Sequence, residues 1–187
     1  MRRAKRNMQG RGMQAPPLIV GVDPALRHFA VVAVERGVIR FALVASTEAR
    51  DGEVKRLFQL TDCYVRFLQA VMPVAAVGVE ELAFAKRSRS VSVMGKLAGV
   101  VCASTYLVGL PCCFVPIQTW KKRFGKANAS ARDLRLQSSV ELPPFKEAWL
   151  DDVFSAYGVA RSVERADVRP VDVESSCIPT MSQAVLF

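Results

Sequence analysis

The first half of the chain alternates between short apolar runs and one long amphipathic segment. Apolar runs at 18–22, 28–35 and 38–46 are separated by short polar connections. Runs of this length, rich in valine, isoleucine and phenylalanine, predict β-strands, and the short connections predict an antiparallel meander. Residues 51–72 then follow a helical period, which predicts a helix that ends before Pro73.

The second half continues the alternation of strands and helices. The apolar run at 74–79 predicts a buried strand, residues 90–107 a helix with several small residues, and 112–115 a further short strand. Segments 130–140 and 147–161 predict two more helices. The expected order is three strands, a helix, a strand, a helix, a strand and two helices, within one α/β domain.

The two ends of the chain differ in composition from this folded part. Residues 1–17 carry five basic side chains and no acid, and residues 163–187 form a polar tail. We therefore expect one domain at 18–162 between an arm and a tail. The arm is consistent with a phosphate-binding segment, an organelle targeting segment or a plain disordered end.

The charge of the chain narrows the class of partner. Its 187 residues include 26 Lys and Arg against 17 Asp and Glu, a formal net charge of +9. This excess favours a polyanion, either nucleic acid or an anionic membrane surface; a basic protein without such a partner is the simpler alternative. No apolar run reaches the length of a bilayer span, so no membrane insertion is expected. With one histidine and no Cys-x-x-Cys pair, the sequence does not favour a structural zinc site.

Acidic residues occur where predicted strands end. Asp23 follows the first strand and Glu80 follows the fourth, so both carboxylates share one sheet edge if these strands are parallel neighbours. On the last helix Asp152 lies roughly 60° from the centre of the apolar face, whereas Asp151 points nearly away from it. We expect Asp152, rather than Asp151, to lean toward the other two acids.

Three converging carboxylates repel one another unless a cation lies between them. Hard divalent cations take oxygen ligands, and two Mg²⁺ ions about 4 Å apart stabilise the attacking and leaving oxygens of phosphoryl displacement. The alternative is that Asp23, Glu80 and Asp152 are ordinary strand-end and helix-surface acids. Their spacing alone leaves both interpretations open.

Several segments resemble RuvC-type Holliday junction resolvases. Residues 19–24, Ile-Val-Gly-Val-Asp-Pro, resemble the family's first strand. Residues 79–100 contain Val-Glu-Glu, then Ala-Lys, then Gly and Ala-Gly-Val, in the family's order and spacing without a gap. Residues 151–160 resemble its closing helix, Asp-x-x-Asp-Ala-x-x-x-Ala, and residues 116–125 resemble the phage and bacterial branch. The resemblance covers roughly residues 18–160.

The resemblance implies an RNase H-like fold, with a mixed five-stranded sheet flanked by helices. It implies a homodimer that binds a four-way DNA junction and nicks two opposed strands with two Mg²⁺ or Mn²⁺ ions per site. Asp23, Glu80 and Asp152 match the first three metal-binding and catalytic carboxylates. A phage or bacterial protein of this kind is cytoplasmic; it is organellar, for example mitochondrial, if residues 1–17 are a targeting segment.

The fourth acidic position of the family is Ser155 in this chain. A hydroxyl is a weaker metal ligand than a carboxylate. Asp151 or Glu81 could substitute as a metal ligand, although Asp151 points the wrong way by helical geometry. The site could also work with three acids. The third interpretation is a catalytically degenerate nucleic-acid-binding protein, for example within a ribonucleoprotein assembly.

Expected nucleic-acid contacts lie in two basic segments. The loop after Glu80 matches the family's junction-contacting loop, where Phe84 either stacks on a base or anchors the loop. Trp120, in the second segment, is expected to be buried, and His28 to be structural. The basic side chains either contact phosphates or form a solvated surface; they are Lys86, Arg87, Arg89, Lys121, Lys122, Arg123, Lys126 and Arg132.

Overall fold

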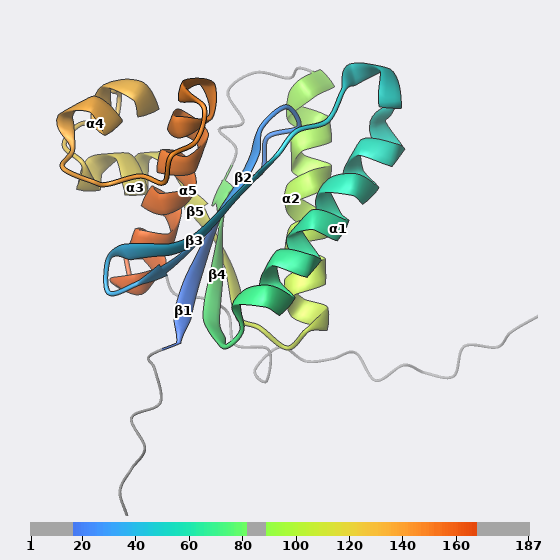
Figure 1. Ribbon diagram of the computed structural model, residues 1–187, viewed down its shortest axis with the longest axis horizontal. Coiled ribbons are helices and arrows are strands. Elements are labelled where there is room, and N and C mark those ends of the chain that lie inside the picture. The colour runs from blue at the N-terminus through green and yellow to red at the C-terminus, as the bar shows by residue number, and fades with distance from the viewer. Residues whose placement is uncertain (1–16, 82–88, 168–187) are drawn as a thin grey trace, which may run out of the picture.

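The computed structural model describes residues 17–81 and 89–167, with side chains from residue 92 onward in the second range. Five strands form one sheet in the order β3-β2-β1-β4-β5 (Figure 1). β1 pairs antiparallel with β2, and β2 with β3, whereas β1–β4 and β4–β5 are parallel. The predicted meander and mixed sheet are therefore confirmed. The strands are β1 (Leu18–Asp23), β2 (Phe29–Glu35), β3 (Val38–Ala45), β4 (Val74–Glu81) and β5 (Cys112–Pro116).

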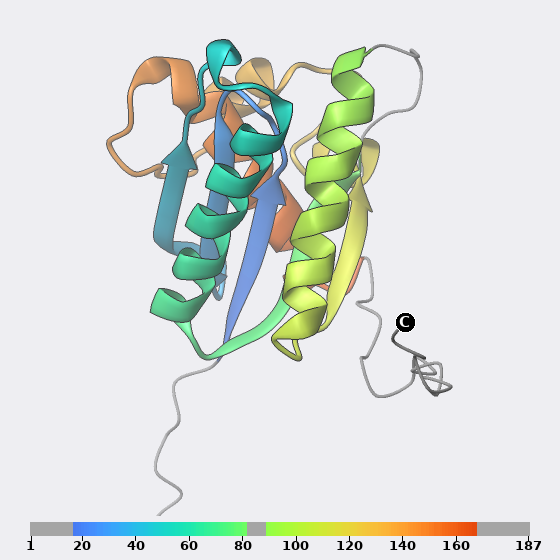
Figure 2. The ribbon, with the colours of Figure 1, turned by 90° about the vertical axis from the view of Figure 1, so that its right-hand side faces the viewer.

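Helices cover both faces of the sheet. α1 (Glu53–Val71), preceded by the short 3₁₀ turn η1 (Ala49–Asp51), lies with α2 (Arg89–Leu107) on one face (Figure 2). α5 (Glu147–Glu164) packs on the other face, beside α3 (Ile117–Arg123) and α4 (Ala131–Gln137) (Figure 1). α3 was not expected as a helix, since its seven residues are too few to show a period.

The alternation of side chains along β1 divides the core into two layers. Val20 and Val22 point toward α1 and α2 and pack with residues such as Leu60 and Leu97. Successive residues of a strand face opposite sides, so Gly21 and Asp23 face α5. Each face of the sheet therefore has its own hydrophobic core, and Asp23 belongs to the face that α5 covers.

α5 is buried more completely than its sequence pattern indicates. One apolar face was expected, but every residue from 153 to 160 is buried. α3 covers the side that points away from the sheet: Trp120 is fully buried, as expected, and packs on Gly158. The helix also continues past the expected end at 161 to Glu164, because Val163 packs against the sheet at Gly78.

One face of α2 is not covered by other described residues. Small residues were expected to allow close packing there. A Cβ added at Gly95 or Gly99 would meet no atom of the described residues within 4 Å. Val100 and Leu107 on the same helix are exposed. Within the described ranges, no helix is both long enough and apolar enough to cross a bilayer.

Candidate active site

Asp23 and Glu80 stand side by side on neighbouring parallel strands. The register pairs Gly21 with Gly78 and Val22 with Val79, so the next residues, the two acids, are level with each other. Paired residues of a sheet project to the same face, which here is the face covered by α5. Asp23 is only 7% exposed and Glu80 only 6%. The expectation that both carboxylates meet at one sheet edge is confirmed.

Two glycines bring α5 close to these acids. A Cβ on Gly21 would lie 2.1 Å from the backbone oxygen of Ala156, and one on Gly78 would lie 2.7 Å from Cγ2 of Val163. Each glycine precedes its acid by two positions and therefore points to the same face as the acid. Asp152 is one helical turn before Ala156, so the close approach of α5 carries it to this edge.

The three carboxylates influence one another electrostatically. Burial raises the pKa of Asp23 well above its usual value, and the negative charges of Glu80 and Asp152 raise it further. Burial also raises the pKa of Asp152. The acids therefore converge as the helical geometry predicted.

Glu80 is held by a tryptophan at the back of the site. Burial is the main reason that its pKa rises to about 7. Trp120 Nε1 donates a hydrogen bond of 2.7 Å to Glu80 Oε1, and this bond and the charge of Lys121 oppose the rise. Trp120 thus fixes the orientation of the Glu80 carboxylate from α3.

The raised pKa of Glu80 predicts that the metal-free protein loses stability as pH increases. An acid whose folded pKa exceeds its unfolded pKa stabilises the fold at low pH, and this stabilisation is lost as pH rises from about 4.5 to about 7. A shift of this size corresponds to about 3 kcal/mol. We expect the unfolding free energy in EDTA to fall over this interval, and Glu80→Gln to flatten the profile. Equal pH profiles for the two proteins in urea titrations would contradict the prediction.

His28 belongs to the same cluster. It lies in the connection between β1 and β2, and its Nδ1 is 3.3 Å from Oδ2 of Asp152. Its ring centroid is 6.3 Å from that of Trp149 on α5. From its sequence, His28 was expected to be structural and was not among the predicted site residues. Its position five residues after Asp23, on the same connection, is the one sequence signal for this contact.

The carboxylate oxygens of the three acids are ligands of the kind that a hard divalent cation takes, but they are not arranged as a complete metal-binding site. Within residues 17–81 and 89–167, no group of three or more His, Cys, Asp or Glu side chains is arranged to hold a metal ion. Two buried carboxylates with raised pKa values nevertheless favour a nearby cation, which would lower those pKa values. Oxygen donors of this kind fit Mg²⁺ or Mn²⁺.

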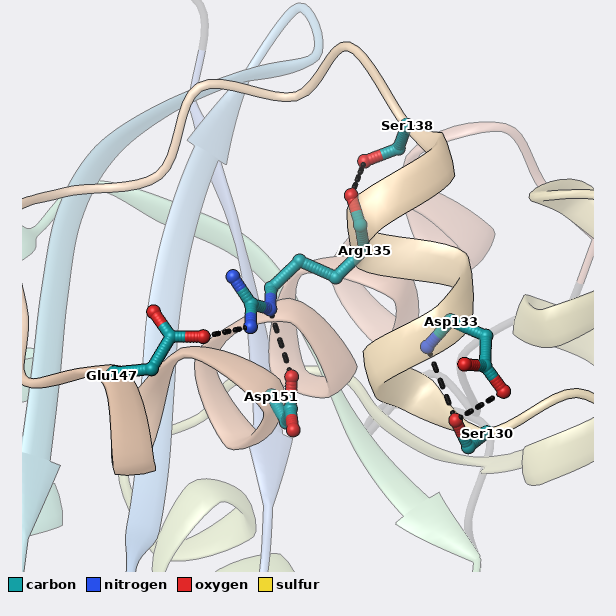
Figure 3. Close-up of polar contacts among 6 residues, drawn as sticks. All are labelled: Ser130, Asp133, Arg135, Ser138, Glu147 and Asp151. Carbon is teal, nitrogen blue, oxygen red and sulfur yellow. Dashed lines mark hydrogen bonds and ion pairs between the residues drawn. The ribbon is translucent and has the colours of Figure 1, made fainter.

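Neither proposed substitute for the fourth acid joins the cluster. Arg135 on α4 donates from Nε to Asp151 at 2.8 Å and also contacts Glu147, so Asp151 faces α4 (Figure 3). Glu81 follows Glu80 on β4 and therefore points to the opposite face of the sheet. The inclusion of Asp151 among the metal ligands is thus not supported by its contacts. Ser155 itself is buried on α5.

The basic residues that were expected to contact nucleic acid differ in whether the structure describes them and in whether they are exposed. Phe84, Lys86 and Arg87 lie outside the described residues, and Arg89 is described only as the first residue of α2. Arg123 was expected to contact phosphate, but its side chain is mostly buried and pairs with Asp167. Lys121 is half-buried; the remaining residues are exposed, namely Lys122, Lys126 and Arg132.

The order β3-β2-β1-β4-β5 of the mixed sheet, with helices on both faces, defines an RNase H-like fold. No protein-family model and no curated protein matches the sequence. Similar solved structures include Thermus thermophilus RuvC, at 17% identity and a TM-score of 0.65, covering 82% of this chain and 99% of that one. T. thermophilus RuvC in complex with a Holliday junction substrate is also similar, at 16% identity and a TM-score of 0.64, covering 83% of this chain and 100% of that one. The predicted five-stranded RNase H-like fold is confirmed.

Proposed function

We propose that this protein is a crossover junction endodeoxyribonuclease, which hydrolyses phosphodiester bonds selectively in four-way DNA junctions. The observation that carries the proposal is the meeting of Asp23, Glu80 and Asp152 at one sheet edge, with pKa values raised by burial and, for Asp23, by the charges of the other two. A structural neighbour with the same fold was solved with a Holliday junction substrate, which supports the choice of DNA.

Asp23, Glu80 and Asp152 are the residues that would hold Mg²⁺ or Mn²⁺, two ions per site. When bound, the ions supply charge stabilisation to the attacking and leaving oxygens of the displacement. Trp120 keeps the Glu80 carboxylate in place through its 2.7 Å hydrogen bond. His28 does the same for Asp152, while Lys121 adds positive charge beside Glu80. These neighbours act as positioning residues, since each contacts an acid.

Two features of the surface support branched DNA and a homodimer. Exposed Lys122, Lys126 and Arg132 lie on or near α3 and α4 and supply charge for backbone phosphates. The open face of α2, with Gly95 and Gly99, offers a place for a second copy. A homodimer would carry two sites, one for each of two opposed nicks.

The test is cleavage of a synthetic four-way junction, compared with a linear duplex of the same sequence. We expect paired nicks on opposed strands in Mg²⁺ or Mn²⁺ and none in EDTA. Failure of the protein to nick the junction in either metal, or equal cleavage of the linear duplex, would rule out a junction-selective endonuclease.

Ser155 favours one alternative, a catalytically degenerate protein that binds nucleic acid without cutting it. Ser155→Asp restores the acid on α5, three residues after Asp152. If the protein is an active nuclease, we expect wild-type nicking, with Ser155→Asp only lowering the Mg²⁺ concentration needed for half-maximal rate. Ser155→Ala is the control for lost hydroxyl contacts. Salt-sensitive junction binding without wild-type nicking, together with cleavage by Ser155→Asp, would instead support the alternative.

A further inference from the structure

A second charged site lies where α3 and α5 end. A cavity of about 520 Å³ opens there, lined by Thr119, Lys122, Arg123, Arg165 and Asp167. Three of these five side chains are cationic and one is acidic. None of the three acids at the sheet edge lines this cavity.

Arg123 is the cavity cation that carries a buried nitrogen without a hydrogen-bond partner in the described residues. Its side chain is only 17% exposed and pairs with Asp167. Its Nε is buried and finds no hydrogen-bond partner in the described part of the chain. Burial lowers the pKa of Arg123, and the positive charges of Arg165 and Arg161 lower it further. The single carboxylate of Asp167 therefore does not balance the positive charge gathered here.

Arg161 does not remove this imbalance, since it pairs with Glu164 on the same helix. Lys122 and Arg165 are exposed and add two positive charges at the cavity. Guanidinium groups present several N–H donors in a planar fork that matches the oxygen atoms of phosphate, and a lysine adds a point charge. The hydroxyl of Thr119 can donate to the same kind of ligand.

We propose that the cavity between α3 and α5 binds a backbone phosphate of the nucleic-acid substrate, away from the carboxylates. This inference rests on the proposed function for the identity of the ligand. Arg165 lies about 20 Å along α5 from Asp152, at 1.5 Å per residue. That length corresponds to about six base pairs of duplex at 3.4 Å each. The cavity would therefore hold a duplex arm, whereas the acids act at the branch.

The test compares Arg165→Gln with wild type in binding a four-way junction in EDTA over a series of KCl concentrations. Arg66→Gln is the matched control, because it removes the same charge from an exposed position on α1, across the sheet. We expect Arg165→Gln to bind several-fold more weakly and to lower the slope of log affinity against log salt by about 0.9, the value for one phosphate contact. Equal slopes for Arg165→Gln and Arg66→Gln would overturn the proposal.

Asp167→Asn tests the site in the opposite direction. It removes the one acid of the cavity, so we expect tighter junction binding, a gain that misfolding cannot imitate. Unchanged or weaker binding by a folded Asp167→Asn protein would count against the phosphate site.

The phosphate bound in the cavity could belong to a nucleic-acid backbone or to a free phosphate compound. Adding orthophosphate at constant ionic strength distinguishes these two sources. If it raises the melting temperature of wild type but not of Arg165→Gln, while both bind the junction equally, the ligand is a free phosphate compound and the proposal fails. Failure of the proposed function looks different. In that case the wild-type protein binds the junction without nicking it, and Arg165→Gln still lowers the slope of log affinity against log salt. The endonuclease proposal would then be wrong and the phosphate site would stand.

Discussion

Asp23→Asn is expected to lower junction nicking by at least about a hundredfold while making the metal-free protein more stable. Loss of a residue that merely supports a metal ligand costs 10–100-fold, so loss of a ligand itself should cost more. The same substitution removes a buried charge whose pKa is raised by burial and by the charges of Glu80 and Asp152. A neutral amide of the same shape relieves this repulsion, so the melting temperature in EDTA should rise.

Two measurements on the same protein check this expectation. Nicking is assayed on the four-way junction in Mn²⁺, and thermal unfolding is followed with and without Mn²⁺. Wild type should gain stability from the metal and Asp23→Asn should gain much less, since binding to the native state stabilises it. Asp62→Asn, at an exposed ion pair on α1, is the matched control and should change neither result. Nicking by Asp23→Asn at the wild-type rate would show that Asp23 is not a catalytic metal ligand.

Gly21→Ala is expected to destabilise the protein by about 3 kcal/mol or more and to weaken metal binding in any molecules that fold. The added Cβ would lie 2.1 Å from the backbone oxygen of Ala156 and 2.6 Å from the backbone nitrogen of Ala160. Backbone atoms cannot rotate aside, so α5 must move away from β1 or the fold must open. Overpacking and strain of this kind are among the largest single-residue effects. Asp152 would move with α5, away from Asp23.

Gly95→Ala supplies the control for the glycine substitution. Its Cβ would meet nothing within 4 Å in the described residues, and alanine is the better helix former by about 1 kcal/mol. Urea unfolding and Mn²⁺ binding are compared at concentrations where all variants share the wild-type oligomeric state. If Gly21→Ala unfolds within about 1 kcal/mol of wild type and binds Mn²⁺ normally, the close approach of α5 does not build the site.

Local pattern was enough to predict most elements and all three acids. The apolar runs ending on Asp23 and Glu80 identified both strand ends, because a strand shows its period within a few residues. The helical period placed Asp152 toward the sheet and Asp151 away from it, and Asp151 indeed pairs with Arg135. Confirmation that β1 and β4 are parallel neighbours came from the register, which no local pattern specifies.

The sequence alone thus determined the order of elements except α3 and which acids could converge, and its resemblance to a known family implied the RNase H-like fold class. Only the tertiary structure decided which side chains support them: Trp120 on Glu80, and His28 on Asp152. It also moved Arg123 from the exposed basic surface into a cavity beside Asp167. These contacts join residues far apart in the chain, so they depend on how α3 and α5 pack, and periodicity along one element carries no information about that packing.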